Sequence, residues 1–348
     1  MRLLVVNAGS SSLKLSVLDA ADATIFERSL EWPKDEDFPH GALDDMPPVD
    51  AVAHRVVHGG EEFQSAVWID DDVREQLAEL TDLAPLHQPR ALAAIDALAD
   101  MRAAACFDTA FHATLAPGAA TYALPAGWPR RRFGFHGLSH AYAARRAAEL
   151  VGGDVPDLRI VSCHLGAGAS LAAIAGGRSV DTTMGFTPLD GLVMASRAGS
   201  VDPGLVLWLA EHRGIPVAEL SDALEHRSGL TGLAGTGDMR ELLARDDGDA
   251  RLALDVYVHR LRGAIAAMAA AMGGFDVLAF TGGVGEHAPA IRAAAADGLA
   301  FLGVALDDRR NAATTSDTDI GADAAAVRSV VLTAREDLEM ARQVRSLG

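Results

Sequence analysis

Two stretches of this sequence share one pattern, RLLVVNAGSSSLKLSVLD at 2–19 and RIVSCHLGAGASLAAIAG at 159–176. Each is typical of a strand, a turn of small residues and a second strand. A turn of Gly, Ala and Ser lets backbone N–H groups approach a ligand, and its hydroxyls add donors, so it can hold phosphate oxygens. Either turn alone is most simply an ordinary β-hairpin. Two copies in one chain indicate a duplicated domain whose turns close around one polyphosphate.

Strand-like and helix-like segments alternate along the chain, which predicts an α/β architecture. Apolar runs of strand length occur at 2–7, 13–19, 49–57, 105–111, 159–165, 170–177, 276–283 and 329–333. Helical spacing or Ala-rich composition marks 89–102, 139–153, 202–214, 250–272, 288–303 and 335–347. The most apolar stretch, 263–274, is too short to span a bilayer and predicts a buried helix.

Length and cysteine usage indicate an intracellular protein of two domains. A chain of 348 residues with 49% hydrophobic content can fill two packed domains. Cys106 and Cys163 both lie in apolar runs, which favours buried free thiols over a disulfide. The first residues contain too few apolar side chains for a secretory signal, so we expect a cytoplasmic location.

The formal net charge of −18 argues against nucleic acid or an anionic membrane as a partner. A small anionic substrate would therefore need local cations. The lysines are Lys14 and Lys34 alone, and Lys14 follows the first Gly/Ser turn.

A third Gly-rich segment, FTGGVGEHA at 280–288, predicts a bend between a strand and a helix where an adenosine could lie. None of these turns is a GxxxxGK[ST] phosphate loop or a GxGxxG fingerprint, which excludes the two commonest nucleotide-binding motifs.

Ten short motifs then follow one another in a familiar order. They are NAGSSSLK (7–14), HRVVHGGE (54–61), LAPLHQP (83–89), FDTAFH (107–112), FGFHGLSH (133–140), CHLGAGAS (163–170), MGFTPLDGL (184–192), SRAGSVDP (196–203), FTGGVGE (280–286) and REDLEMAR (335–342). In sequence and order these motifs resemble the acetate kinase family. The resemblance extends from residue 3 to about residue 342.

That resemblance implies two duplicated ribonuclease-H-like domains of the actin-like ATPase type with a cleft between them. It places an N-terminal acyl-kinase domain at 1–108 plus 337–348 and a C-terminal nucleotide-binding and dimerisation domain at 109–336. The implied reaction is ATP plus acetate to ADP plus acetyl phosphate, reversible and dependent on Mg²⁺ or Mn²⁺. The implied assembly is a homodimer.

The resemblance also assigns catalytic roles, which suit phosphoryl transfer because that reaction needs alignment and positive charge around the moving phosphoryl group. Arg55 and Arg197 match the arginines that flank the reaction centre, and a guanidinium can hold a carboxylate bidentately. His136 matches a hydrogen-bond donor to the phosphoryl group. Asp108 matches the carboxylate that positions the catalytic arginine.

Further residues are assigned to ligands in the same way. Asn7 and Glu336 match the metal site, although Glu336 could instead be a first-turn acid that stabilises its helix. The acyl pocket is assigned to Arg55, Val57, Leu86, Phe135 and Pro188. The nucleotide site is assigned to Ser10, Ser12, Lys14, His164, Gly166, Gly168, Asp238, Met239, Arg240, Gly283, Val284 and Gly285.

The chain departs from the family pattern in the second phosphate turn, where Ala167 replaces an asparagine and Ala169 a serine. We expect these losses to weaken ATP binding or alter the choice of phosphate donor. Met239 replaces a common phenylalanine, His287 replaces an asparagine, and the chain is shortened mainly between Asp19 and Asp50. A propionate kinase, a non-catalytic nucleotide-binding module and a phosphatase or pyrophosphate-dependent variant remain alternatives.

Overall fold

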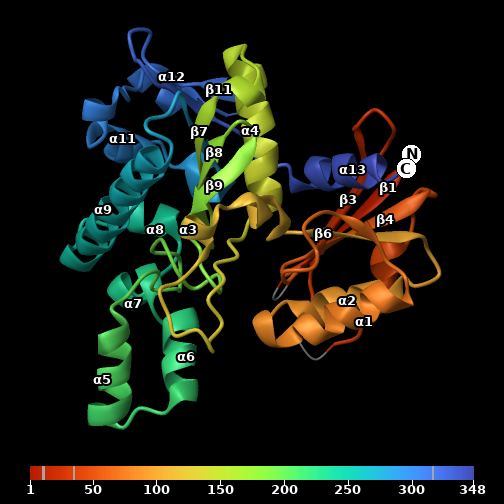
Figure 1. Cartoon of the computed structure of the whole chain (residues 1–348). Helices are drawn as coiled ribbons and strands as arrows, with labels where there is room; N and C mark the ends of the chain where they lie inside the picture. Colours follow the sequence, from red (N-terminus) through yellow and green to blue (C-terminus); the bar gives the residue numbers. More distant parts are fainter. Residues whose placement is uncertain (10–11, 34–35, 316) are drawn as a thin grey trace. The chain divides into compact units, whose positions relative to one another are not determined.

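The computed structural model describes residues 1–9, 12–33, 36–315 and 317–348, and it divides into two compact units. The first unit contains Met1–Ala113, Phe135–Tyr142 and Arg335–Gly348. The second contains Thr114–Gly134 and Ala143–Ala334. Helix α4 (Gly137–Val151) begins in the first unit and ends in the second. Each unit is built on a six-stranded mixed sheet, and Figure 1 labels most of the strands.

The sheet of the first unit has the order β3-β2-β1-β4-β6-β5. Strands β1, β2 and β3 form an antiparallel meander, β4 and β6 run parallel to β1, and β5 pairs antiparallel with β6. The strands are β1 (Leu3–Ala8), β2 (Ser12–Leu18), β3 (Thr24–Glu31), β4 (Ala51–Val56), β5 (Val67–Trp68) and β6 (Ala103–Phe107).

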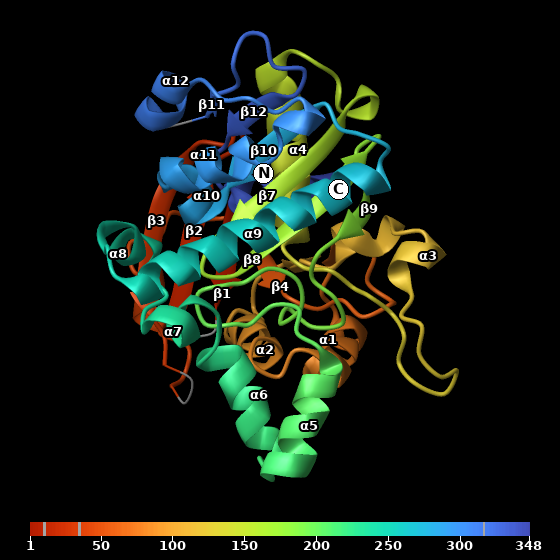
Figure 2. The same ribbon diagram turned by 90° about the vertical axis from the view of Figure 1, so that its left-hand side faces the viewer.

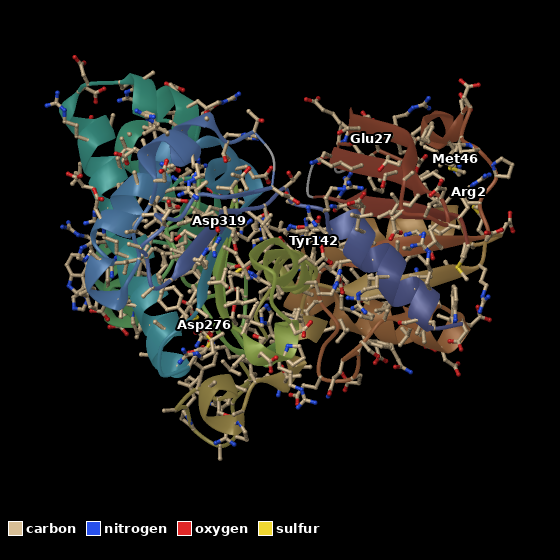
Figure 3. The ribbon with its side chains drawn as sticks, turned by 90° about the horizontal axis from the view of Figure 1, so that it is seen from above. Arg2, Glu27, Met46, Tyr142, Asp276 and Asp319 are labelled. Carbon is tan, nitrogen blue, oxygen red and sulfur yellow. The ribbon has the colours of Figure 1, made fainter. Side chains whose placement is uncertain are left out.

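Strand β1 is buried on both faces, which explains its unbroken apolar run. Leu4 and Val6 belong to a core cluster with Ala94 of α2 (Gln88–Ala97). Leu3 belongs to a separate cluster with Met340 of α13 (Glu336–Ser346). Figure 3 shows α13 lying along the strands of this sheet. Helix α1 (Asp71–Glu79) packs beside α2.

The sheet of the second unit repeats this topology, with the order β11-β12-β10-β7-β8-β9. Again three strands form an antiparallel meander, two run parallel to the first, and the last pairs antiparallel. The strands are β7 (Arg159–Leu165), β8 (Ala169–Ala175), β9 (Arg178–Thr182), β10 (Val277–Thr281), β11 (Thr318–Asp319) and β12 (Arg328–Val331). The duplication expected from the two similar turns is therefore confirmed at the level of strand order.

Helix α9 (Gly248–Ala271) packs against β7, β8 and β9 and is seen along its length in Figure 2. The prediction of a helix at 263–274 is confirmed as the end of α9, but its complete burial is wrong. Ile265 and Met268 are buried, while Gly263 and Ala267 are exposed. The exposed face of this part of α9 carries small residues such as Gly263 and Ala267 instead of charged ones. The sequence of an amphipathic helix therefore has an apolar pattern on every face.

The remaining helices of the second unit are short. They are α3 (Pro117–Ala120), α5 (Pro203–Arg213), α6 (Val217–His226), α7 (Gly229–Ala234), α8 (Met239–Ala244), α10 (Gly282–His287), α11 (Pro289–Asp297) and α12 (Asp308–Ala313). No helix in the described ranges is long and apolar enough to cross a membrane. Cys106 and Cys163 are buried free thiols, as predicted.

Candidate active site

In the first unit, Arg55 lies at the centre of a polar network. Its Nε and Nη2 atoms donate to Asp108 Oδ1 and Oδ2 at 3.1 and 2.5 Å, and its Nη1 donates to Asn7 Oδ1 at 3.0 Å. Asn7 Nδ2 lies 3.5 Å from Glu336 Oε2, a long contact. The structure thus brings together four of the residues that the sequence assigned to catalysis and metal binding.

Strand pairing explains why these side chains meet. Asn7 is near the end of β1, Arg55 near the end of β4, and Asp108 directly after β6. The three strands are adjacent and parallel, so their carboxyl ends lie at one edge of the sheet, where ligands of α/β proteins commonly bind. Glu336 is the first residue of α13, so its position also suits a first-turn acid.

The electrostatics of the network keep Arg55 charged. Burial acts to lower the pKa of Arg55, but the charges of Asp108 and Glu336 and the hydrogen bond to Asp108 outweigh it, so the pKa is raised. Asp108 is 1% exposed and its charge is compensated by the guanidinium. Arg55 has five N–H groups, and the three bonds to Asp108 and Asn7 within the described residues leave two for a ligand.

His136 is tied to this network through the backbone. It has a left-handed conformation, with φ of 57°, and its carbonyl accepts from His140 N at the start of α4. The next residue, Gly137, donates its N–H to the Asp108 carbonyl at 2.8 Å. A Cβ atom at Gly137 would collide with that carbonyl, so only glycine allows the close approach.

The first-unit residues that the sequence assigned to an acyl pocket differ in exposure. Val57 and Phe135 are 6% and 1% exposed, whereas Leu86 is 38% exposed. The Phe135 ring meets His58 edge to face at 5.6 Å between centroids. Pro188, the remaining member, lies in the second unit.

The first phosphate turn connects β1 and β2, and Gly9 N donates to Ser12 O at 2.8 Å. Lys14 is exposed on β2, where it pairs with Asn7 in the strand register. Ser10, assigned to the nucleotide, lies outside the described residues.

In the second unit, the second phosphate turn joins β7 to β8 and carries Gly166 and Gly168, whose backbones bond at 3.0 Å. His164 is the penultimate residue of β7. Ala167 is exposed, but Ala169 is completely buried in β8. The expectation that both alanines remove polar groups near the nucleotide is therefore better suited to Ala167 than to Ala169.

Arg197 is anchored on an irregular segment of the same unit. Its Nη1 donates to Pro188 O at 3.1 Å, and its Nε lies 3.4 Å from Glu225 Oε2. Burial lowers the pKa of Arg197, with Glu225 acting in the opposite direction. The backbone beside it is linked to the phosphate turn because Ala195 N donates to Ala167 O at 3.1 Å. Arg197, Pro188 and the second turn thus form one connected group.

The residues assigned to the nucleoside begin two short helices. Asp238 caps α8, where Oδ1 accepts from Arg240 N at 2.8 Å, and an ion pair of 2.8 Å joins the two side chains. The side-chain bond to Arg240 lowers the pKa of Asp238 to about 2. Met239 is 5% exposed. Gly283, Val284 and Gly285 lie in α10, so the predicted Gly-rich bend is a short helix.

Two residues that sequence reasoning missed support α10. Glu286 Oε1 accepts from Gly282 N and Ala334 N, both at 3.0 Å. Arg292, 1% exposed, donates Nη1 to the carbonyls of Gly285 and Glu286, both at 2.8 Å. In the sequence, Arg292 looks like any other helical residue that follows a Gly-rich segment. Only its burial in the structure identifies it as a residue that supports α10.

Comparisons with known proteins show the family to which the chain belongs. A model of the Acetokinase family matches residues 39–342. An acetate kinase of Nostoc punctiforme is 41% identical, with 98% of each chain covered. The crystal structure of Porphyromonas gingivalis acetate kinase is similar at a TM-score of 0.91 and 33% identity over 100% of both chains. A propionate kinase from Francisella tularensis is similar at a TM-score of 0.88 and 31% identity over 98% of both. The chain therefore belongs to the acetokinase family, whose members are kinases that transfer phosphate from ATP to the carboxylate of acetate.

Proposed function

We propose that this protein catalyses the reversible transfer of the γ-phosphate of ATP to acetate, giving ADP and acetyl phosphate. The observation that carries the proposal is the arginine of the first unit: Arg55 is held by Asp108 and Asn7 at the carboxyl ends of three parallel strands. A guanidinium fixed in this way is ready to bind an anion before the anion arrives, which is the kind of preorganisation that phosphoryl transfer requires.

In this proposal Arg55 binds the carboxylate of acetate, and Arg197 binds the phosphoryl group. The two remaining N–H groups of Arg55 bind the acetate carboxylate, with Val57, Leu86, Phe135 and Pro188 around its methyl group. Arg197 and His136 donate to the oxygens of the phosphoryl group in transfer. Little covalent help from the protein is needed, because the reaction depends on alignment and charge.

The nucleotide is assigned to both phosphate turns and to α10. Ser10, Ser12 and Lys14 contact phosphate from the first turn, and His164, Gly166 and Gly168 from the second. Asp238, Met239 and Arg240 with Gly283, Val284 and Gly285 hold the nucleoside. The domain division that we propose, 1–108 plus 337–348 and 109–336, differs from the compact units at 109–113, 135–142 and 335–336, which lie in the first unit.

Magnesium is the metal we propose, and the donor set of the first unit suits it. Mg²⁺ usually takes one or two carboxylates and completes its octahedron with water and phosphate. Glu336 offers a carboxylate, and the Asn7 amide oxygen, which accepts one bond from Arg55, has a second lone pair, whereas both oxygens of the Asp108 carboxylate are bonded to Arg55. Among the described residues no group of three acidic, His or Cys side chains is placed to hold a metal. Bound there, the ion would neutralise phosphate charge.

The direct test is to identify the product. Purified protein with ATP, Mg²⁺ and acetate should form acetyl phosphate, detected by ³¹P NMR and by trapping as the hydroxamate, and EDTA should abolish it. Formation of ADP without acetyl phosphate would contradict the proposal. The same experiment with propionate tests the alternative favoured by the similarity to a solved propionate kinase.

We also propose a homodimer formed through the second unit, in a cytoplasmic setting that suits the two free thiols. Helix α5 has no buried residue, and Leu205, Leu207 and Trp208 are 50%, 61% and 42% exposed. An apolar surface of this kind marks an interaction site. Light scattering should give the mass of a dimer for the wild type and of a monomer for Leu207→Glu. A monomeric wild type would contradict this assembly.

A further inference from the structure

Residues 183–202 have neither helix nor strand, yet they include Pro188 and Arg197. A long irregular segment keeps one shape only where its backbone groups are bonded to something else. What fixes this segment therefore also fixes the residues that the proposed function places around the substrate.

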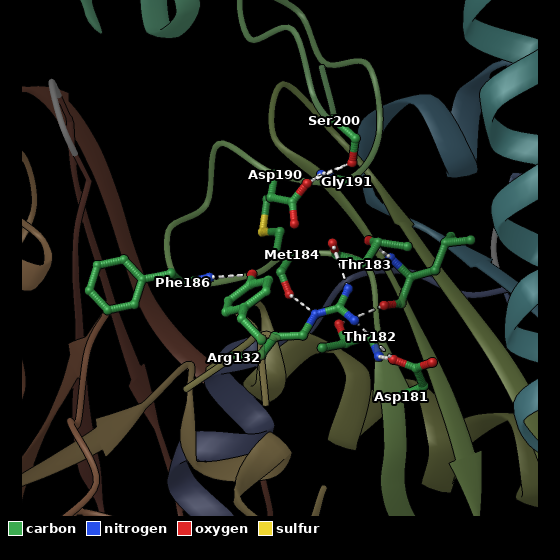
Figure 4. Close-up of polar contacts among 11 residues, drawn as sticks. Arg132, Asp181, Thr182, Thr183, Met184, Phe186, Asp190, Gly191 and Ser200 are labelled. Carbon is green, nitrogen blue, oxygen red and sulfur yellow. Dashed lines mark hydrogen bonds and ion pairs between the residues drawn. The ribbon is translucent and has the colours of Figure 1, made fainter. Parts of the chain in front are cut away.

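Arg132 holds the start of the segment with one planar guanidinium (Figure 4). Its Nη2 donates to the Thr183 carbonyl at 3.1 Å and its Nε to the Met184 carbonyl at 3.3 Å. Its Nη1 lies 3.4 Å from Asp181 Oδ1. The fixed fork of an arginine can bind neighbouring carbonyls simultaneously, which a lysine ammonium does less well.

Tyr122 holds the next residues. Its hydroxyl accepts the N–H of Phe186 at 3.0 Å, two residues before Pro188. A Cβ atom at Gly185 would collide with that hydroxyl, so the tyrosine rests directly on the glycine. The Gly185 carbonyl accepts from the N–H groups of Phe133 and Gly134 at 3.1 and 3.2 Å.

Tyr122 and Arg132 belong to one support. Tyr122 N donates to the Arg130 carbonyl and Arg132 N to the Ala120 carbonyl, both at 2.7 Å. This short antiparallel pairing fixes the two side chains relative to each other, so they can define the path of 183–186 together.

A second clip closes the segment around Arg197. Asp190 Oδ1 accepts from Gly191 N at 2.8 Å and from Ser200 Oγ at 2.6 Å, and Ser200 N donates to the Gly191 carbonyl at 2.9 Å (Figure 4). This clip fixes the far part of the segment through contacts that involve neither Tyr122 nor Arg132.

We propose that Tyr122 and Arg132 are positioning residues that set the selectivity of this kinase for the length of its carboxylate substrate, by fixing the backbone of 185–188. The inference rests on the proposed function, which places Pro188 in the acyl pocket. When the bond to Phe186 N is lost, the backbone before Pro188 relaxes, and the pocket discriminates less sharply between acetate and a longer acid.

The first test compares two tyrosine variants. Tyr122→Phe removes the hydroxyl that Phe186 uses, whereas Tyr257→Phe removes a buried hydroxyl that has no hydrogen-bond partner among the described residues. Losing one hydrogen bond should raise the propionate-to-acetate ratio of kcat/KM by about threefold to tenfold in Tyr122→Phe. The KM for ATP should stay near the wild-type value, and Tyr257→Phe should leave the ratio unchanged.

The second test uses arginines. Arg132→Lys loses the fork at residues 183 and 184, and Arg159→Lys loses an equally forked contact with Asp276, labelled in Figure 3, elsewhere in the unit. Arg132→Lys should shift the same ratio and speed hydrogen exchange of the amides of residues 183–187, and Arg159→Lys should do neither.

The outcomes separate the two claims. A wild type that phosphorylates no carboxylate contradicts the proposed function, whereas the exchange measurement still tests the support of the segment. An active wild type whose acyl selectivity and exchange are unchanged in folded Tyr122→Phe and Arg132→Lys overturns the positioning role. A lowered Tm with unchanged acyl selectivity also overturns the positioning role, because this is the result expected of a residue that only stabilises the fold.

Discussion

The carboxylate of Asp108 binds the Arg55 guanidinium side-on, with Nε to Oδ1 at 3.1 Å and Nη2 to Oδ2 at 2.5 Å. Arg74 and Asp96 form the same side-on pair at 2.9 and 2.7 Å, but on the surface, where their side chains are 38% and 50% exposed. The two pairs therefore differ in burial while sharing a geometry.

Asp108→Asn should lower kcat by about 10-fold to 100-fold, because one charge-assisted bond that orients Arg55 is lost. Breaking a buried pair should also lower the free energy of unfolding by about 3 kcal/mol or more. Asp96→Asn is the matched control, and its exposed pair should contribute less than about 1 kcal/mol. Steady-state kinetics and urea unfolding measure both; equal effects of the two substitutions would show that Asp108 has no special role.

Arg197→Ala should reduce kcat by about 10³-fold to 10⁵-fold, the range observed for arginines that stabilise a phosphoryl group in transfer, and we expect the same of Arg55→Ala. Arg227→Ala, which removes an exposed arginine paired with Asp222, is the control. Turnover close to wild type in Arg197→Ala would remove this residue from the mechanism.

Ala167→Asn should tighten ATP binding by about tenfold, because a new hydrogen bond to a charged group contributes roughly 1.5 to 3 kcal/mol. Ala169→Ser should instead destabilise the fold, because its side chain is buried and a hydroxyl there must find a partner. The KM for ATP and the urea midpoint separate the two effects. An unchanged KM for ATP in Ala167→Asn would mean that an asparagine at this position of the turn adds no hydrogen bond to the nucleotide.

Much of the fold could be predicted from the sequence. All eight predicted strands and all six predicted helices are present, with shifts at their ends. The strands β3 and β9 were missed because both carry charged residues and neither gives an apolar run. Strand β3 has no buried residue, whereas β9 is exposed only at Arg178. Strands β5 and β11 are two residues long and give no periodic signal at all.

The sequence predicted residues of the candidate site only where a recognisable motif contains them. Asn7, Arg55 and Asp108 were named from separate motifs, and strand pairing explains why they meet. The close approach of Gly137 to the Asp108 carbonyl depends on a backbone conformation that no residue pattern states. The support from Tyr122 and Arg132 depends on tertiary contacts to carbonyl groups, which leave no trace in the sequence.

His54 should make the first unit sensitive to acid. It is 1% exposed, and neither ring nitrogen has a hydrogen-bond partner among the described residues. Burial lowers the pKa of His54 to about 3, from an ordinary value of 6.5. Between these values the unfolded chain binds a proton that the folded protein does not, so the free energy of unfolding falls as the pH falls from about 6.5 towards 3.

His54→Leu removes this titration and should flatten the dependence of stability on pH. Urea unfolding at pH 7 and pH 5 provides the measurement, and the loss of stability between them should be smaller in the variant by about 1 to 2 kcal/mol. An identical loss in both proteins would assign the acid sensitivity to other groups.

Val57→Ala should raise the propionate-to-acetate ratio of kcat/KM by roughly tenfold, because one methylene accommodated in a pocket is worth about 1 to 3 kcal/mol. Val52→Ala makes the same truncation in the sheet core, where Val52 is completely buried, and should lower stability without changing the ratio. A ratio that is unmoved in Val57→Ala would place the acyl pocket elsewhere.

Phosphorylation of acetate by this chain is tested by the kcat/KM of the wild type for formate, acetate, propionate and butyrate, with ATP and Mg²⁺ in a coupled assay of ADP formation. The kcat/KM for acetate should exceed that for propionate, and the kcat/KM for butyrate should be low. No turnover with any of the four acids, or a preference for propionate or butyrate over acetate, would contradict it.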